Sequence, residues 1–380
     1  MKQQPRSKIE QLIAELCPNG VEFRMMEEVV TIKHGKDYKS LGDGNVPVYG
    51  SGGIMTHADT YSYNKPSVLI PRKGTITNLF FVETPFWNVD TIFYTVIKTE
   101  KIIPKFLYFY LKTVDLAALD TGSGRPSLTI QILNKLRIPT PPLTIQEEIV
   151  KILNKFTELE AELEAELEAR ILQYEYYREK LLSSNDDDNS IQLKDVASYS
   201  KTRIAANELD FDSYVGVDNL LQNRQGKTVS SYVPKVGNLT KYETDDILIG
   251  NIRPYLKKIW QASNTGGTNG DVLVIRINEE QKRELNSRFL YHLLASNDFF
   301  NYDMQHAKGA KMPRGNKDAV LKYKIPKISY EEQVKISNTL DKFEVLVNDI
   351  SIGLPAELNA RRQQYEYYRD KLLTFNEYVG

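Results

Sequence analysis

The decapeptide QYEYYREKLL at Gln173–Leu182 returns as QYEYYRDKLL at Gln364–Leu373, with a single Glu→Asp change. An internal repeat defines the architecture of a chain before any local prediction is made. This repeat indicates that the chain carries two copies of one structural plan. Such a chain is built to do one task at two places.

Further matches between the two halves keep the same order, while their offset grows from 167 to 191 residues. The matches are Glu28-Val29 with Asp195-Val196, Val68–Ile70 with Ile247–Ile249, Asn88-x-Asp90 with Asn269-x-Asp271, Phe106 with Phe289, Gly122 with Gly309, Gln146 with Gln333, and Phe156 with Phe343. An ordered series of this kind indicates a duplication of almost the whole chain.

Length and composition describe an ordinary globular protein. The chain has 380 residues, of which 41% are apolar and 26% charged, enough for two or three domains with real cores. No apolar run approaches the ~20 residues of a membrane span, and the N-terminus lacks a signal-peptide pattern. We therefore expect a cytoplasmic protein. Its one cysteine, Cys17, excludes an intramolecular disulfide and a cysteine-based zinc cluster.

Charge is unevenly distributed along the chain. Residues 1–143 carry a net charge of +4, residues 144–189 carry −8, residues 190–328 carry +6, and residues 329–380 carry −3. Basic lobes favour contact with a polyanion, because Lys and Arg near phosphates release condensed counterions. Ordinary surface chemistry is the alternative explanation for so small an excess.

The two acidic segments have helical patterns. In the first, apolar residues recur about every 3.6 residues from Ile149 to Leu181, which predicts one long helix over Thr144–Leu182, with Thr144 and Glu147 as a capping box. The second repeats this pattern, but Gly353-Leu354-Pro355 interrupts it, so we predict a break there. Each acidic helix needs an apolar partner, and the other one is the obvious candidate.

The basic lobes have the pattern of mixed α/β domains, with short strands, glycine-rich turns and one helix each, near Lys105–Ala118 and Ser287–Phe300. The predicted fold class is α+β, with two lobes separated by two long helical segments that pack antiparallel, related by pseudo-two-fold symmetry. The predicted domains are a first lobe at 1–143, a central long helix with its linker at 144–189, a second lobe at 190–328 and a C-terminal helical segment at 329–380.

No catalytic constellation is present in the sequence. The four histidines show no metal-ligand spacing, and there is no GxSxG, P-loop or GxGxxG motif. We therefore predict no catalytic residue and no metal site, which makes an enzyme the weakest of the function classes considered.

Each lobe does place basic and amide side chains among glycines. Glycine lets backbone approach a phosphate closely, and Arg, Lys and Asn are the side chains that read base edges. The candidate DNA-contacting residues are Lys36, Arg72, Lys73, Asn78, Arg125 and Ser127 in the first lobe, and Asn251, Arg253, Lys257, Lys258, Lys311 and Arg314 in the second. For any single residue, a solvated turn with ordinary surface charge is the competing interpretation.

Several stretches together resemble one known family. They are Leu16–Phe23, Pro47–Ile54, Pro85–Thr91, Gly124–Leu128, Ile138–Leu143, Gln146–Val150 and the two decapeptides. With the order lobe, helix, lobe, helix, the chain resembles the DNA-sequence specificity (S) subunits of type I restriction–modification systems.

The resemblance implies two target-recognition domains, each reading one half of a bipartite site on double-stranded DNA. It implies two modification (adenine-N6 methyltransferase) subunits as partners and, through them, restriction subunits. S-adenosylmethionine, ATP and Mg would then belong to those partners, and this chain would hold no cofactor. The main alternative is a coiled-coil scaffold that binds only protein.

One hypothesis concerns the helices of such a subunit, which would set the spacer between the half-sites. Deleting Ala161–Glu164 removes about one helical turn, so it is expected to shorten the spacer without altering either half-site.

Overall fold

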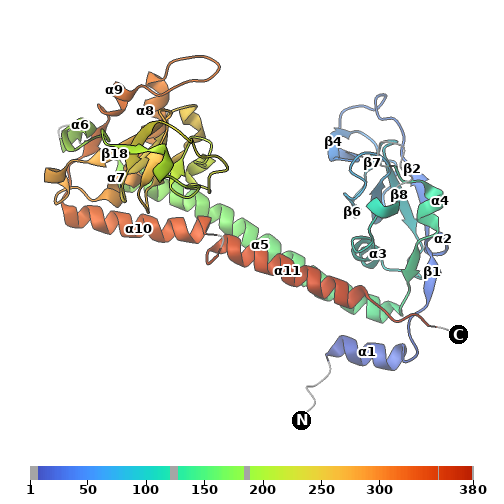
Figure 1. The fold of residues 1–380 in the computed structure, drawn as a ribbon. Helices are drawn as coiled ribbons and strands as arrows, with labels where there is room; N and C mark the ends of the chain where they lie inside the picture. Colours follow the sequence, from blue (N-terminus) through green and yellow to red (C-terminus); the bar gives the residue numbers. More distant parts are fainter. Residues whose placement is uncertain (1–6, 120–126, 184–188, 350, 379–380) are drawn as a thin grey trace, which may run out of the picture. The chain divides into compact units, whose positions relative to one another are not determined.

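The computed structural model describes residues 7–119, 127–183, 189–349 and 351–378. It divides into two compact units (Figure 1). The first unit combines Met1–Glu162 with Asn359–Gly380, and the second is Leu163–Leu358. Each unit contains one of the basic lobes together with parts of both acidic helical segments.

The lobe of the first unit is built on two small sheets. One sheet has the order β2-β8-β5-β6 and is antiparallel throughout, and the other has the order β4-β3-β7. The strands are β2 (Val30–His34), β3 (Val46–Gly50), β4 (Gly53–Ala58), β5 (Ser67–Pro71), β6 (Phe80–Val82), β7 (Trp87–Asn88) and β8 (Ile92–Ile97). All five residues of β5 are buried, because it pairs on both edges and helix α3 (Pro104–Leu111) packs against it.

A short two-stranded ladder, β1 (Phe23–Met25) with β9 (Arg137–Pro139), brings the two ends of this lobe together. The remaining short helices of the unit are α1 (Lys8–Leu16), α2 (Met26–Val29) and α4 (Ile130–Asn134). The sequence analysis did not predict α1, although Ser7 and Glu10 form a complete capping box at its start.

The second lobe repeats this plan with more strands. Its sheets have the orders β11-β18-β15-β16 and β12-β14-β17-β13, and the ladder of β10 with β19 joins the ends of the lobe. The strands are β10 (Ser190–Gln192), β11 (Ala197–Tyr199), β12 (Arg203–Ala205), β13 (Tyr214–Val215), β14 (Asn238–Tyr242), β15 (Ile247–Gly250), β16 (Ile259–Gln261), β17 (Gly266–Thr268), β18 (Val272–Ile277) and β19 (Lys324–Pro326). The helices are α6 (Leu193–Val196), α7 (Ser287–Leu294), α8 (Asn297–His306) and α9 (Lys317–Val320).

Both lobes depart from the predicted single helix. In the first, α3 ends at Leu111, and the Asp115 carboxylate then accepts hydrogen bonds from the amides of Ala117 and Ala118, so the predicted helix to residue 118 is too long. In the second, the predicted helix is two helices, because the Ser296 hydroxyl accepts from the amide of Phe299 and starts α8 anew.

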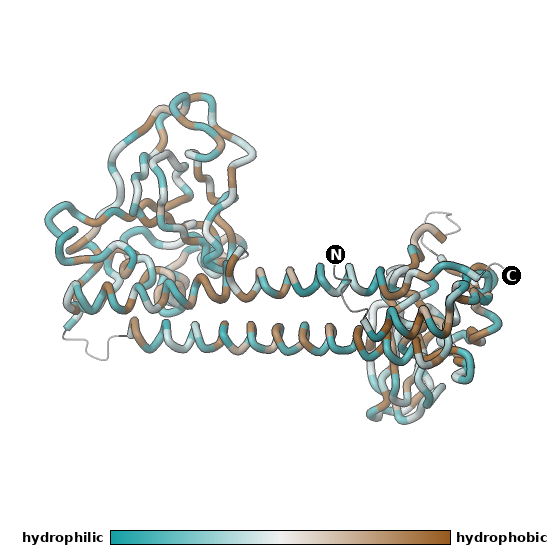
Figure 2. Tube along the Cα trace, turned by 90° about the horizontal axis from the view of Figure 1, so that it is seen from below, coloured by the Kyte–Doolittle hydropathy of each residue, from teal (hydrophilic) through white to brown (hydrophobic). Residues whose placement is uncertain are grey.

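The acidic segments form the long helices that the sequence predicts. Helix α5 (Leu143–Leu182) has 40 residues, and the second segment is broken into α10 (Tyr330–Asn348) and α11 (Leu354–Leu373) at the predicted position. Apolar and polar residues alternate along α5 and α11 (Figure 2). The predicted capping box is wrong, because α5 begins one residue before Thr144 and its first amides donate to the Pro142 carbonyl. No helix in the described part of the chain has both the length and the apolar character needed to cross a bilayer.

A buried glutamine fastens each lobe to the helix that follows it. Gln146 on α5 accepts from the amide of Ile103 at 2.8 Å and donates to the carbonyls of Lys101 and Pro141. Gln333 on α10 repeats the arrangement with the amide of Asn286, also at 2.8 Å, and with two carbonyls. Because all three bonds are made away from water, each glutamine fixes the lobe–helix angle within its own unit.

Tyrosines of each decapeptide pack against an aromatic residue of another helix. In the first unit, Phe156 of α5 lies 5.4 Å from Tyr368 and 6.4 Å from Tyr365 of α11, and Glu160 pairs with Arg362 at 2.7 Å, so the two helices run antiparallel. In the second unit, Phe343 of α10 stacks on Tyr174 and Tyr177 of α5. In each unit, therefore, tyrosines of a decapeptide pack between two helices.

Candidate nucleic-acid interface

The glycine-rich basic segments of each lobe are joined in pairs by backbone hydrogen bonds. In the first lobe, Lys73 and Ser127 form an isolated bridge, and the amide of Leu128 donates to the Arg72 carbonyl at 2.9 Å. In the second lobe, Ile252 and Arg314 form the same bridge, and the amide of Gly315 donates to the Asn251 carbonyl at 3.0 Å. We call these segments the paired loops. They are 71–78 with Ser127 in the first lobe, and 251–258 with 308–316 in the second.

The paired loops of the first lobe hold most of the residues predicted there. The side chain of Lys73 is exposed, whereas that of Arg72 is half-buried, with its guanidinium 5.4 Å from the centre of the Phe93 ring. Asn78 is half-buried at the end of the loop, and the side chain of Lys36 is exposed. The hairpin turn between β3 and β4 is close by, since the Ser51 hydroxyl lies 3.5 Å from where a Cβ on Gly74 would be.

The backbone of Lys36 lies beside β7, where its carbonyl accepts from the indole of Trp87 at 3.0 Å. The remaining two predicted residues are Arg125 and Ser127. Arg125 lies outside the described residues, and Ser127 is half-buried in the bridge with Lys73.

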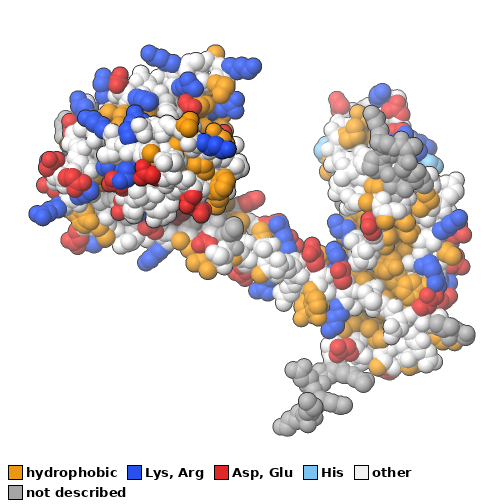
Figure 3. Space-filling model, in the orientation of Figure 1, with side chains coloured by type: hydrophobic (Ala, Val, Ile, Leu, Met, Phe, Trp, Pro, Cys, Tyr) orange, Lys and Arg blue, Asp and Glu red, His pale blue; other side chains and the backbone are white. Residues whose placement is uncertain are grey.

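In the second lobe the predicted residues divide into two groups. The side chains of Arg253, Lys311 and Arg314 are exposed, and Arg314 makes an ion pair with Asp271 at 3.3 Å. Lys257 and Lys258 instead bond inward, to the side chain of Asn297 and to the carbonyl of Val217, respectively. Asn251 is buried. Lysine and arginine side chains gather on the part of the second lobe away from α5 and α10 (Figure 3).

Comparison with known proteins identifies the family. The family model described as "Type I restriction modification DNA specificity domain" matches residues 18–173 and again residues 185–360. The chain belongs to this family. Its two matches cover the two halves that the internal repeat defines.

Relatives of this specificity subunit span its whole length. A putative type I restriction enzyme specificity subunit of Haemophilus influenzae is 31% identical over 390 residues, covering 94% of this chain and 96% of the relative. The EcoR124I/EcoR124II specificity subunit of Escherichia coli is 27% identical, with 72% of each chain covered. The S subunit from M. genitalium has the same fold, with a TM-score of 0.57 at 16% identity over 93% of this chain and 96% of the other.

The sequence analysis missed an acidic group beneath the paired loops of the second lobe. Asp303 on α8 is completely buried, and neither of its carboxylate oxygens has a hydrogen-bond partner among the residues that the structure describes. Burial raises the pKa of this carboxyl to about 6. A Cβ on Gly315 would lie 2.6 Å from one Asp303 oxygen and 2.7 Å from the Asn251 amide oxygen, so only glycine lets the second loop pass between these groups.

One cluster in the specificity subunit has the composition of a metal site. Ligand atoms of His292, Asp341 and Glu344 lie within 4.8 Å of one another. The Arg288 guanidinium occupies the position of a cation, since it bonds to Asp341 and to Glu344 at 2.5 Å each. Burial between α7 and α10 lowers the pKa of His292 and so favours its neutral imidazole. The group is therefore an ion-pair network that fastens lobe to helix.

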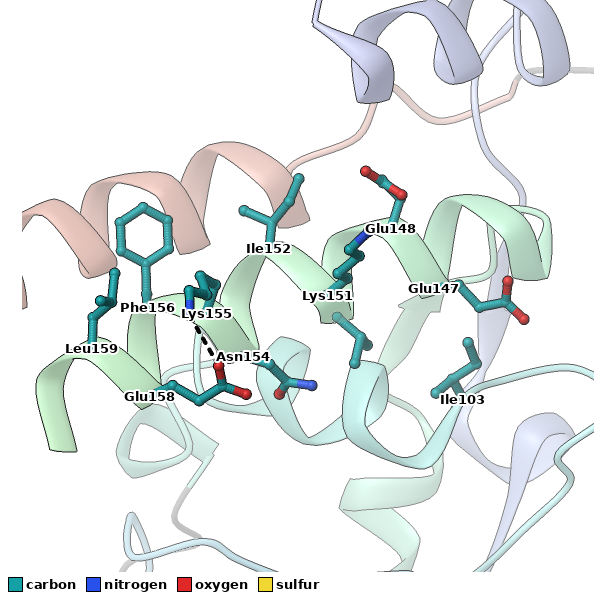
Figure 4. A pocket seen from close by; sticks show the side chains of 11 residues that line it. Ile103, Glu147, Glu148, Lys151, Ile152, Asn154, Lys155, Phe156, Glu158 and Leu159 are labelled. Carbon is teal, nitrogen blue, oxygen red and sulfur yellow. Dashed lines mark ion pairs between the residues drawn. The ribbon is translucent and has the colours of Figure 1, made fainter. Parts of the chain in front are cut away.

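A groove of about 710 Å³ runs along the first turns of α5 (Figure 4). Its lining includes Val150, Ile152 and Leu159, with charged side chains at the edge, among them the 3.5 Å ion pair of Lys155 and Glu158. Small-molecule sites are enclosed and place a few polar groups toward one point. The open, mainly apolar lining here is typical of a protein contact rather than of a reaction site.

Proposed function

We propose that the paired loops are the segments with which this specificity subunit reads its DNA, one half-site per lobe. The chain is a type I specificity subunit, which directs modification and restriction subunits to a bipartite sequence. One observation carries the assignment of the loops: the same backbone bridge recurs in both lobes, at segments that carry basic residues beside glycine. Side chains differ between the copies while the frame is shared, as two readers of different sequences require.

The basic residues of the glycine-rich segments supply the proposed contacts. Arg72, Lys73 and Arg125 would serve one half-site, and Arg253, Lys311 and Arg314 the other. An arginine can bond both acceptors of guanine in the major groove, and a lysine can also contact phosphate. Lys257 and Lys258 are weaker candidates in this form of the protein, because their amines are bonded within the lobe.

The chemistry of the complex would belong to its other subunits. We propose that this chain is non-catalytic, that two methyltransferase subunits bind it, and that S-adenosylmethionine, ATP and Mg act on those partners. The protein would then work in the cytoplasm, where its DNA is found. The alternative, a scaffold that binds only protein, predicts no dependence of DNA affinity on this chain.

Co-expression of the chain with its methyltransferase subunit tests the proposal. Mapping N6-methyladenine across the genome is expected to give one bipartite motif, and the double variant R253A/R314A should lose base preference in one half of it. Lys335→Ala is a matched control, since this exposed lysine lies on α10 and pairs with Glu331. DNA binding by the complex should weaken steeply with salt. An unchanged motif in R253A/R314A would refute the assignment of these loops.

A further inference from the structure

The second lobe holds its reading loop in an uncommon backbone conformation. Arg253 and Lys257, which flank the short turn Pro254–Leu256, have φ angles of 53° and 50°. Arg253 corresponds to Gly74 of the first lobe, which has φ 79°. Non-glycine residues rarely adopt this region, and they persist there only where their surroundings hold them. Because Arg253 stands where the other copy has glycine, contacts from outside the loop must hold it in this conformation.

These contacts form a hydrogen-bonded group that joins the loop to α5. The amide of Arg224 donates to the Lys257 carbonyl at 3.0 Å, and both side chains donate to the amide oxygen of Asn297. Glu175 closes the group, because its two oxygens accept from Arg224 and from Asn297 at 3.0 Å each. The backbone N–H of Asn297 also donates to the Glu179 carboxylate at 3.1 Å.

Charge makes Glu175 the critical member of this group. Arg178 is 2% exposed, Arg224 is 10% exposed, and Glu175 contacts both guanidinium groups. Burial lowers the pKa of Arg224 and of Lys257, and the neighbouring cations lower both further. Without the Glu175 carboxylate, Arg178, Arg224 and Lys257 would lose the anion that faces them, and Glu179 would remain to offset the charge of Arg224 and Lys257, so the loop would be driven away from the helix.

We propose that Glu175 is a positioning residue for DNA reading by the second lobe. It acts through Arg224, Asn297 and Lys257 on the loop that carries Arg253. The decapeptide that identifies the repeat thus also helps to set which sequence is read. This inference rests on the proposed function of the paired loops.

The second decapeptide supplies the control. Glu366 occupies the position of Glu175, and its side chain is exposed on α11. The neighbouring Arg369 pairs with Asp370 at 2.7 Å, within its own helix. In the first lobe Gly74 adopts its positive φ without a side chain to strain, so no such group is needed there.

The test compares E175Q with E366Q in the full chain, co-expressed with the methyltransferase subunit. In E175Q, discrimination between the cognate duplex and one altered in a single half-site is expected to fall ~10-fold. The affected half should be the one relaxed by R253A. Discrimination at the other half should be retained, and E366Q should match the wild type at both.

A second variant guards against misfolding of E175Q. Lys257→Met removes the loop's own link to Asn297 but leaves the buried pair of Arg224 and Glu175, and it should relax the same half-site. Full discrimination in both E175Q and K257M would overturn the inference, as would equal loss of affinity for all duplexes. A wild-type complex that methylates no bipartite motif would instead refute the proposed function.

Discussion

The two decapeptides differ in one residue of ten, yet their arginines lie in different surroundings. Arg178 is 2% exposed and lies 4.1 Å from the centre of the Tyr174 ring, whereas the side chain of Arg369 is 17% exposed, with its guanidinium 5.9 Å from the Tyr365 ring centre. The tyrosines do the same work in both copies, packing on Phe343 and Phe156. The two copies therefore share a packing seam, while the charged residues beside it have different contacts in the two units.

The largest expected effect separates the two arginines. R178A should destabilise the second unit by about 3 kcal/mol, because it removes a buried side chain that packs on the Tyr174 ring and donates to the Tyr174 hydroxyl. R369A should cost the first unit less, about 1 kcal/mol, because its partner Asp370 is exposed and the two residues are neighbours on one helix. Hydrogen exchange read separately in each unit measures both. Equal losses would show that the two settings are equivalent.

A pH prediction concerns Asp303, which lies beneath the paired loops of the second unit. Its folded pKa of about 6 is above the ordinary 3.8, so its contribution to stability is fully present below about pH 4 and is lost as pH rises through 6. Asp303→Asn keeps the shape without the charge. At pH 7.5 it should stabilise the second unit by up to about 3 kcal/mol, and the difference from the wild type should vanish near pH 4. A difference independent of pH would contradict this.

The exposed basic residues of each lobe should affect recognition of the half-site that their own lobe reads. Arg253→Ala or Arg314→Ala is expected to cost about 1–3 kcal/mol of binding to the cognate duplex and to relax only the half-site of the second lobe. Lys73→Ala should act on the first half-site. Competition with duplexes altered in one half measures this. A residue that lowers affinity equally for every duplex contacts phosphate instead.

The smallest effect concerns the backbone at the matched positions Gly74 and Arg253. Gly74→Ala should destabilise the first unit by about 1 kcal/mol, because its φ of 79° is unfavourable for any side chain and the space around it is open. Arg253→Gly should stabilise the second unit by a similar amount while it loses discrimination at one half-site. Thermal unfolding, monitored by hydrogen exchange in each unit, measures both changes in stability. A stabilising Gly74→Ala would show that the turn is not strained.

Much of the fold was predictable because the chain states it twice. The short strands of both lobes, the long helix α5 and the break before α11 all follow from local patterns, and the structure confirms them. Local patterns failed near Ser296, whose hydroxyl starts a new helix, and near Asp115, whose carboxylate accepts from amides beyond the end of α3. Such a side-chain hydrogen bond offers the backbone an alternative to the helical bond. The spacing of apolar residues does not reveal it.

The site was only partly accessible from sequence. Glycine and basic residues indicated the loops, and the structure joins them in pairs through Lys73 with Ser127 and Ile252 with Arg314. No sequence pattern indicated Asp303, which is distant in the chain from Asn251. A signal existed for the strained loop, since the repeat aligns Arg253 with Gly74.

By itself the sequence determined the duplication, the helical period and the family, because each is encoded in residues that are neighbours along the chain or recur at fixed spacing. Only the tertiary structure decided which charged side chains are available to DNA. Lys257 and Arg253 stand four residues apart in one basic loop, yet one amine is bonded to Asn297 and the other side chain is exposed. That difference depends on α5 and α8, which fold against the loop from distant parts of the chain, so no local pattern contains it.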